Sequence, residues 1–209
     1  MRLKLIFSFP LIFIFAVITH PVHASSRGKQ QFQLCTSCHG PNAEGRKKLA
    51  APSIAGLPQW YIERQLNNFK SGARGQHPKD VPGMRMAPMA RSLRYKGDIA
   101  AVAAHVAKLP AKRVQSDFKT GNLENGKSLY NICLACHGAN GEGNKMMNGP
   151  PLMQLDPWYM RTQINNFKSG LRGANAAKDP VGASMAPMAQ TLADDQAIID
   201  VITYIMSLK

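Results

Sequence analysis

Cysteine and histidine are scarce in this chain, and acidic residues are few. The 209 residues include 4 cysteines and 6 histidines, and 12 Asp and Glu stand against 26 Lys and Arg. No run of alternating apolar and polar residues marks a half-buried strand. Beyond the N-terminus, no stretch is apolar and long enough to cross a bilayer. These absences argue against a sheet-based fold and against membrane spans in the body of the chain.

The first 24 residues are typical of an export signal. Arg2 and Lys4 precede an almost wholly apolar run, and residues 22–24 (VHA) end in the small residue that export peptidases prefer. The run is short for a membrane span, which needs about 20 residues, although an uncleaved anchor remains an alternative. We therefore expect cleavage after Ala24 and a soluble mature protein in the periplasm.

Positive charge is concentrated in the first half of the mature chain. Residues 25–118 hold 16 Lys and Arg against 5 Asp and Glu, whereas residues 119–209 hold 8 against 7. A solvated basic face is one explanation, but an asymmetry of this size favours a docking surface for something acidic. Nucleic acid is a poor candidate, because the chain has an export signal and no recognisable nucleic-acid-binding module. An acidic protein or an anionic membrane surface fits better.

The chain is a tandem duplication. Three segments recur 98 or 99 residues further on: 28–45 at 126–143, 60–75 at 158–173, and 86–93 at 185–192. A repeat that runs through nearly the whole mature chain predicts two similar domains. We place them at residues 25–115 and 116–209.

Each copy is predicted to be mostly helical. We expect a first helix before the cysteines and a middle helix that ends at a glycine: 28–38 and 60–69, then 126–136 and 158–167. Apolar residues spaced i, i+3, i+4, i+7 predict the last helix of each copy: Ile99, Val102, Ala103 and Val106, then Ile198, Val201, Ile202 and Ile205. The Pro- and Gly-rich segments between the middle and last helices predict irregular loops. So few short helices bury little apolar surface, which indicates that a large apolar group is missing from the core.

All four cysteines lie in two C-x-x-C-H motifs. An isolated pair could form a disulfide or a thioredoxin-like site, but the latter needs a βαβ context that is absent. One motif supplies only three of the four ligands that a zinc site needs. Two thiols on one helical turn can instead bond to a haem edge, and the adjacent imidazole then reaches the iron. The sequence therefore predicts two covalent haem c groups, attached through Cys35, Cys38, Cys133 and Cys136, with His39 and His137 as proximal ligands.

A sixth iron ligand should occur in both copies, between the middle and last helices. His77 and His105 have no counterparts in the second copy, which excludes a shared histidine. The repeated MAPMA segment offers two pairs of methionines: Met86 with Met185, and Met89 with Met188. We favour the first pair, because a ligand shortly before a proline suits an extended loop across the haem face. The second pair, the fallback, would then pack in the core.

With these motifs in view, the mature chain resembles the diheme cytochrome c4 family, in which two class I cytochrome c domains follow one another. The resemblance is carried by C-x-x-C-H before GPNAEG or GANGEG, by the WY…Q…NFKSG segments, and by M-x-x-M-A-x-x-L before the last helix. It implies an all-α fold with a few helices wrapped around each haem. It gives the iron-ligand role to Met86 and Met185, and it implies that the Pro52 and Pro150 carbonyls accept a hydrogen bond from the proximal imidazole.

The resemblance also implies that a glycine and an aromatic residue of the first helix pack against an aromatic residue of the last. That set is complete in the second copy and interrupted by a histidine in the first: Gly126, Tyr130 and Tyr204 against Gly28, Phe32 and His105. How tightly the first pair of helices closes is therefore open. Arg74 and Arg172 recur after the middle helix, and they either pair with haem propionates or are solvated.

Two haems with closed ligand sets predict electron transfer rather than catalysis on a substrate. The resemblance implies a periplasmic carrier that takes electrons from a quinol-oxidising complex or a dehydrogenase and passes them to a terminal oxidase or reductase. A cytochrome subunit held permanently by a dehydrogenase or an oxidase is an alternative. A diheme peroxidase is another, but it needs one haem that loses its distal ligand, and the matched MAPMA segments give no sign of unequal sites.

Overall fold

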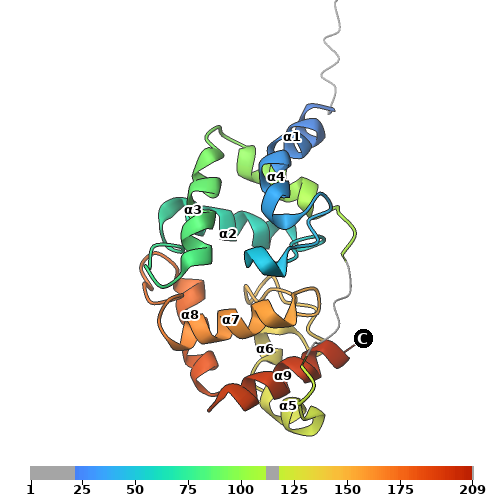
Figure 1. Cartoon of the computed structure of the whole chain (residues 1–209), viewed down its shortest axis with the longest axis vertical. Coiled ribbons are helices and arrows are strands. Elements are labelled where there is room, and N and C mark those ends of the chain that lie inside the picture. Colours follow the sequence, from blue (N-terminus) through green and yellow to red (C-terminus); the bar gives the residue numbers. More distant parts are fainter. Residues whose placement is uncertain (1–21, 112–117, 209) are drawn as a thin grey trace, which may run out of the picture.

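The computed structural model describes residues 22–111 and 118–208, which form two helical domains, one above the other in Figure 1. The first domain comprises α1 (Val22–His39), the 3₁₀ turn η1 (Lys47–Leu49), α2 (Gln59–Ser71), α3 (Val81–Ser92) and α4 (Asp98–Val106). The second comprises α5 (Leu123–Tyr130), α6 (Leu134–His137), α7 (Pro157–Lys168), α8 (Pro180–Gln190) and α9 (Asp195–Ser207). Over these described residues the only β pairing is two isolated bridges, so the all-α prediction is confirmed.

Two sequence-based predictions fall on other residues. The boundary at 115/116 and residues 1–21 of the export signal lie outside the described part of the chain. Among the helices that are described, none is long and apolar enough to span a membrane.

The first and last helices of each domain pack closely together because a glycine lies at each crossing. A Cβ on Gly28 would lie 2.2 Å from the carbonyl oxygen of Ala101 in α4. In the second domain a Cβ on Gly126 would lie 2.1 Å from the carbonyl oxygen of Asp200 in α9. Only a residue without a side chain allows the two backbones to approach so closely.

Aromatic contacts complete the same crossings. The rings of Tyr130 and Tyr204 lie 5.5 Å apart at 53°, and those of Phe32 and His105 lie 5.4 Å apart at 54°. The two geometries are nearly the same, so the imidazole of His105 takes the place of the second aromatic ring. The first pair of helices therefore closes as tightly as the second.

The predicted core positions of the last helices are largely confirmed. Three of the four are buried in α4 and all four in α9: Val102, Ala103, Val106, Ile198, Val201, Ile202 and Ile205. The remaining one, Ile99, is half-buried. The middle helices α2 and α7 extend a residue or two beyond their predicted ends, and glycines follow them at Gly72 (φ 75°) and Gly170 (φ 73°).

The prediction of irregular loops between the middle and last helices was wrong for the MAPMA segments, which lie in α3 and α8. The Asp80 carboxylate accepts a hydrogen bond from the Gly83 amide at 3.1 Å. Asp179 and Gly182 form the same contact at 2.9 Å. Such N-caps, with proline in the first helical turn, start a helix even where the sequence shows no apolar period.

The prediction of one continuous first helix in the second domain was also wrong. Residues 131–133 form a tight turn between α5 and α6, in which the Cys133 amide donates to the Tyr130 carbonyl at 2.8 Å. Asn131 and the β-branched Ile132 stand where α1 has Gln33 and Leu34, and both favour a helix less.

Candidate haem sites

Each domain contains a large cavity with mostly apolar walls. The empty space is about 1210 Å³ in the first domain and about 1220 Å³ in the second, open mouth included. Apolar side chains of the core line both, among them Leu57, Ile62, Leu66 and Phe69 in the first and Leu152, Met160, Ile164 and Phe167 in the second. Cavities of this kind suit a large apolar ligand.

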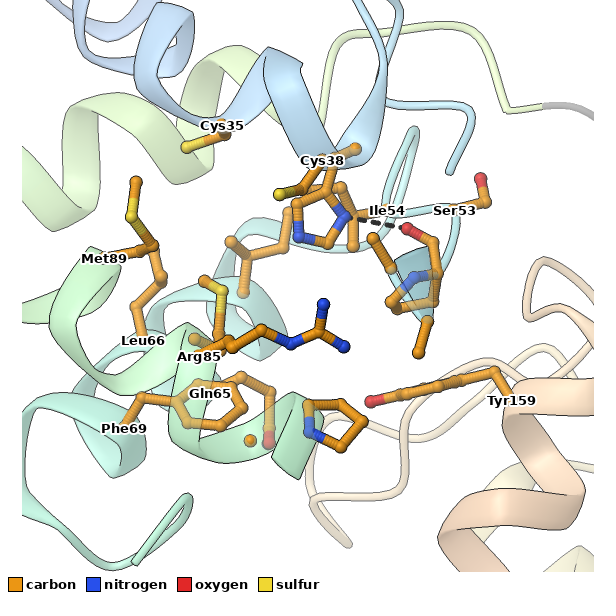
Figure 2. Close-up of a pocket in the computed structure, with 18 of the residues that line it drawn as sticks. Cys35, Cys38, Ser53, Ile54, Gln65, Leu66, Phe69, Arg85, Met89 and Tyr159 are labelled. Atoms are coloured by element: carbon orange, nitrogen blue, oxygen red, sulfur yellow. Dashed lines mark hydrogen bonds between the residues drawn. The ribbon is translucent and has the colours of Figure 1, made fainter. Parts of the chain in front are cut away.

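A buried imidazole faces each cavity. His39 and His137 are each 8% exposed. Their Nδ1 atoms lie 2.8 Å from the carbonyl oxygens of Pro52 and Pro150, and Figure 2 shows the first of these bonds as a dashed line. Burial lowers the pKa of both imidazoles, and the bond to the carbonyl opposes this only in part. A neutral ring that donates through Nδ1 keeps the Nε2 lone pair available for a metal.

The four cysteines line the same two cavities as the histidines. Burial, and secondarily the neighbouring cysteine, raises the pKa of Cys35 and Cys133 to about 11. These thiols are therefore protonated at neutral pH, unlike the thiolates of a redox-active pair. Figure 2 shows Cys35 and Cys38 on one side of the first cavity, with Gln65 and Tyr159 on the other.

Methionines reach each cavity from α3 or α8. Met86 and Met185 are half-buried, and both line the walls. Met89 and Met188 also line the cavities but are 36% and 40% exposed, so the prediction that they pack in the core was wrong. The reason is the helix: residues three apart lie on the same face, so both methionines of a pair face the cavity.

Arg74 and Arg172 are buried, at 7% and 9% exposed, so they are not solvated loop residues. Each guanidinium lies over a phenyl ring, at 4.5 Å from Phe69 and 4.6 Å from Phe167. Each Nε is buried without a hydrogen-bond partner among the described residues, and each arginine lines its cavity. An unsatisfied cationic donor beside an apolar cavity fits a ligand with acidic groups, as the propionates of haem provide.

The same arginines connect the domains. Arg74 donates to Gln65 in its own domain at 2.9 Å and to Gln163 in the other at 2.8 Å. Arg172 repeats this pattern, with Gln163 at 2.9 Å and Gln65 at 3.0 Å. Arg74 also donates to the Tyr159 hydroxyl at 2.9 Å. Burial raises the pKa of Tyr159, but the two guanidinium groups outweigh it and lower that pKa below its usual value.

One layer of side chains separates the two cavities. Five residues line both of them: Tyr61, Gln65, Leu155, Tyr159 and Gln163. In Figure 2, Tyr159 enters the first cavity from the ribbon of the second domain. Sequence analysis missed this wall, although the recurrence of the glutamine in both WY…Q…NFKSG segments was a signal for it.

Both halves of the chain match the family model of cytochrome c, over residues 25–110 and 123–209. A "Thiosulfate dehydrogenase electron acceptor" of Stutzerimonas stutzeri (strain A1501) is 30% identical over 172 residues, covering 78% of this chain and 73% of that one. A cytochrome c4 of Azotobacter vinelandii is 25% identical over 166 residues, covering 74% and 77%. The crystal structure of reduced recombinant cytochrome c4 from Pseudomonas stutzeri has a TM-score of 0.70 at 23% identity, covering 88% and 98%.

Two helical domains, each built around a C-x-x-C-H motif and an apolar cavity, define a tandem c-type cytochrome. The chain belongs to the cytochrome c family, whose model matches each of its halves, and it is similar to cytochromes c4 in sequence and in fold. It is an electron-transfer cytochrome of a family that binds haem covalently. The predicted family, fold and class of function are thus confirmed.

Proposed function

We propose that this chain is a periplasmic electron carrier with one covalent haem c in each domain. It would receive single electrons from a quinol-oxidising complex or a dehydrogenase and pass them to a terminal oxidase or reductase. When bound, haem supplies reversible one-electron chemistry at its iron. The observation that carries the proposal is the pair of cavities, each with a thiol pair and a buried imidazole, separated by one shared layer of side chains.

Each cavity has a residue of the right chemistry for every contact with haem. The cysteine sulfurs of each motif would hold the group covalently, and the imidazole would be one ligand of its iron. Met86 and Met185 would be the others, because they are half-buried where Met89 and Met188 are exposed. A thioether ligand raises the reduction potential and leaves no open position for a substrate. The Nε atoms of the buried arginines would bind the propionates.

The loops beside the two cavities differ in charge. Residues 46–49 (RKKL) are exposed and carry three cations, and Leu49 lines the first cavity. The matching residues 144–147 (NKMM) carry one cation and two exposed methionines, and Met147 lines the second cavity. We therefore assign the mouth of the first cavity to an acidic partner protein, whose approach positive charge would steer.

A second candidate is a cytochrome subunit of a larger redox complex. The mouth of the second cavity is rimmed by exposed apolar side chains: Ile132, Met147 and Met188. An exposed apolar rim of this kind is typical of a surface that another protein covers. Because the Stutzerimonas relative is named an electron acceptor of thiosulfate dehydrogenase, such a dehydrogenase is one partner to test. Co-purification of the native protein with a dehydrogenase or an oxidase would favour this candidate over a free carrier.

The proposal is tested by absorption spectra of the holoprotein. We expect the weak sulfur-to-iron band to account for two haems and the reduced protein to bind no carbon monoxide. Met86→Ala and Met185→Ala should each remove about half of the band, whereas Met89→Ala and Met188→Ala should leave it unchanged. Loss of the band in Met89→Ala and Met188→Ala would instead identify Met89 and Met188 as the iron ligands. Carbon monoxide binding at one haem of the wild type would instead favour a peroxidase.

A further inference from the structure

One peptide group of the first domain connects the proximal imidazole to a carboxylate of the second domain. Its carbonyl, on Pro52, lies 2.8 Å from Nδ1 of His39. Its amide, on Ser53, donates to Oδ2 of Asp156 at 2.7 Å across the domain boundary. Ser53 is 3% exposed and Asp156 is 9% exposed, so both ends are shielded from water. The imidazole, the peptide and the carboxylate therefore form one chain of hydrogen bonds.

The second domain cannot form the same chain. The Pro150 carbonyl lies 2.8 Å from Nδ1 of His137, the same distance as in the first domain. The amide of that peptide belongs to Pro151, which has no N–H to donate. The position that matches Asp156 is Pro58, and the two residues cap α7 and α2 in the same place. Of the two buried imidazoles in the described part of the chain, His39 alone is therefore connected to an anion through such a peptide.

A carboxylate that accepts a hydrogen bond from a peptide N–H polarises that peptide. The carbonyl oxygen gains negative charge and becomes a stronger acceptor, because hydrogen bonds in a chain reinforce one another. The imidazole that donates to it becomes a more basic metal ligand. A more basic ligand and a nearby negative charge both favour ferric over ferrous iron. Burial limits the screening of that charge.

We propose that Asp156 acts through the Pro52–Ser53 peptide to lower the reduction potential of the first-domain haem below that of the second. Asp156 is thus a positioning residue for His39, supplied by the other domain. This inference rests on the proposed function, since it requires a haem on each histidine. The unequal potentials give electron flow a direction, from the basic first domain, where the acidic partner docks, to the second.

The test is a spectroelectrochemical titration of the holoprotein and its Asp156→Asn variant. The substitution keeps the shape and an acceptor oxygen but removes the charge. We expect the equilibrium constant for reduction of the lower-potential haem to increase about tenfold, which raises its reduction potential by about 59 mV for one electron. The reduction potential of the other haem should change much less. Glu63→Gln is the control. It removes a surface carboxylate of α2 whose hydrogen bond, from the side chain of Gln59, lies within the same helix.

A measurement at the imidazole distinguishes an effect of Asp156 on His39 from a role in which Asp156 only holds the two domains together. In the reduced wild type, the Nδ1 proton of His39 should resonate downfield of that of His137 in ¹H NMR and exchange more slowly. In Asp156→Asn it should move toward the His137 position. Equal resonances in the wild type, or a variant in which both redox steps shift together or neither moves, would overturn the proposal. A wild type with only one haem would instead count against the proposed function.

Discussion

Arg74 and Arg172 are buried cations whose hydrogen bonds run both within and between the domains. The planar fork of a guanidinium lets one side chain bind two glutamines while its Nε faces a cavity. A lysine in the same place would keep the charge but could not reach these partners together. At this scale, charge alone does not explain why an arginine follows each middle helix.

Arg74→Lys should lower the free energy of unfolding of the holoprotein by about 2 kcal/mol, because it leaves the buried Tyr159 hydroxyl without its arginine donor and removes one of the two arginine donors to Gln163. Guanidinium-induced unfolding, followed through the haem spectrum, measures this. Arg161→Lys is the matched control: the Arg161–Asp195 pair is exposed on both sides, so the change should stay within about 0.5 kcal/mol. Equal losses in the two variants would show that the network between the domains contributes nothing.

Among the secondary-structure elements, the crossings of α1 with α4 and of α5 with α9 determine the shape of each domain. A glycine brings the backbones together at each crossing, and two rings fill the space beside it. A buried carboxylate adds a further connection at each crossing: Asp98 of α4 accepts from Arg27 of α1 at 2.8 Å, and Asp200 of α9 accepts from Asn125 of α5 at 2.7 Å. Similar interactions thus stabilise two crossings of nearly the same geometry.

Gly126→Ala should destabilise the second domain by about 2 kcal/mol, since its Cβ would overlap the Asp200 carbonyl and force the helices apart. Thermal unfolding of the holoprotein, with the two haems monitored separately, measures the loss. Ser128→Ala changes an exposed residue of the same helix and should be close to neutral. A stable Gly126→Ala protein would mean that α5 can move without cost.

Asp200 should make the second domain sensitive to acid. Its carboxylate accepts hydrogen bonds from the Asn122 amide and from the side chains of Asn125 and Gln196, at 2.8, 2.7 and 2.8 Å. Burial raises the pKa of Asp200, but these three bonds together lower it below the usual value. A lowered folded-state pKa gives stability that is present above about pH 4 and is lost as the pH falls through the folded value.

Asp200→Asn should therefore unfold at lower temperature than the wild type at pH 7, with a difference that shrinks below about pH 4. Melting temperatures measured from pH 7 down to pH 2 test this sign. Asp195→Asn removes an exposed carboxylate of the same helix and should give no such convergence. A difference in melting temperature between Asp200→Asn and the wild type that stays constant with pH would contradict a stabilising role for the charged Asp200 carboxylate.

The sequence predicted the elements whose signal is local. The apolar period of α4 and α9 and the glycines after α2 and α7 lie within a few residues of what they specify. The helices α3 and α8 were missed because their apolar sides face a cavity and a proline interrupts each, so no period was visible. The Ser53–Asp156 contact joins residues 103 apart in the chain, and no local pattern specifies such a pair. Its traces in the sequence are the departures of Ser53 and Asp156 from the repeat, which has Pro151 and Pro58 at the matching positions.

Across the whole molecule, the domains share a geometry but differ in surface charge. Residues 46–49 and 144–147 occupy matching places beside the two cavities, yet one is strongly basic and the other largely apolar. Long-range attraction acts on the rate of encounter and weakens with salt. The two mouths should therefore respond differently to ionic strength.

Exchanging the loop charge tests this. The double variant Arg46→Asn, Lys48→Met gives the first loop the charge of the second. With an acidic redox partner at low ionic strength, stopped-flow reduction should slow by about tenfold, and the rates of variant and wild type should converge at high salt. Lys127→Met, an exposed change in α5, should leave the rate close to that of the wild type. Equal salt dependence in all three proteins would exclude the first mouth as the docking site.

The hydrogen bonds of Arg74 and Arg172 across the domain boundary are reciprocal. Arg74 donates to Gln163 of the second domain, and Arg172 donates to the matching Gln65 of the first. That is the pattern of an isologous interface, the kind found in a two-fold homodimer. In a homodimer, any substitution must appear on both sides at once. Covalent fusion of the two copies removes this constraint, so a change can be made on one side alone. The bond from Ser53 to Asp156 is such a one-sided pair, because the matching positions of the repeat hold Pro151 and Pro58, and a homodimer could not encode it.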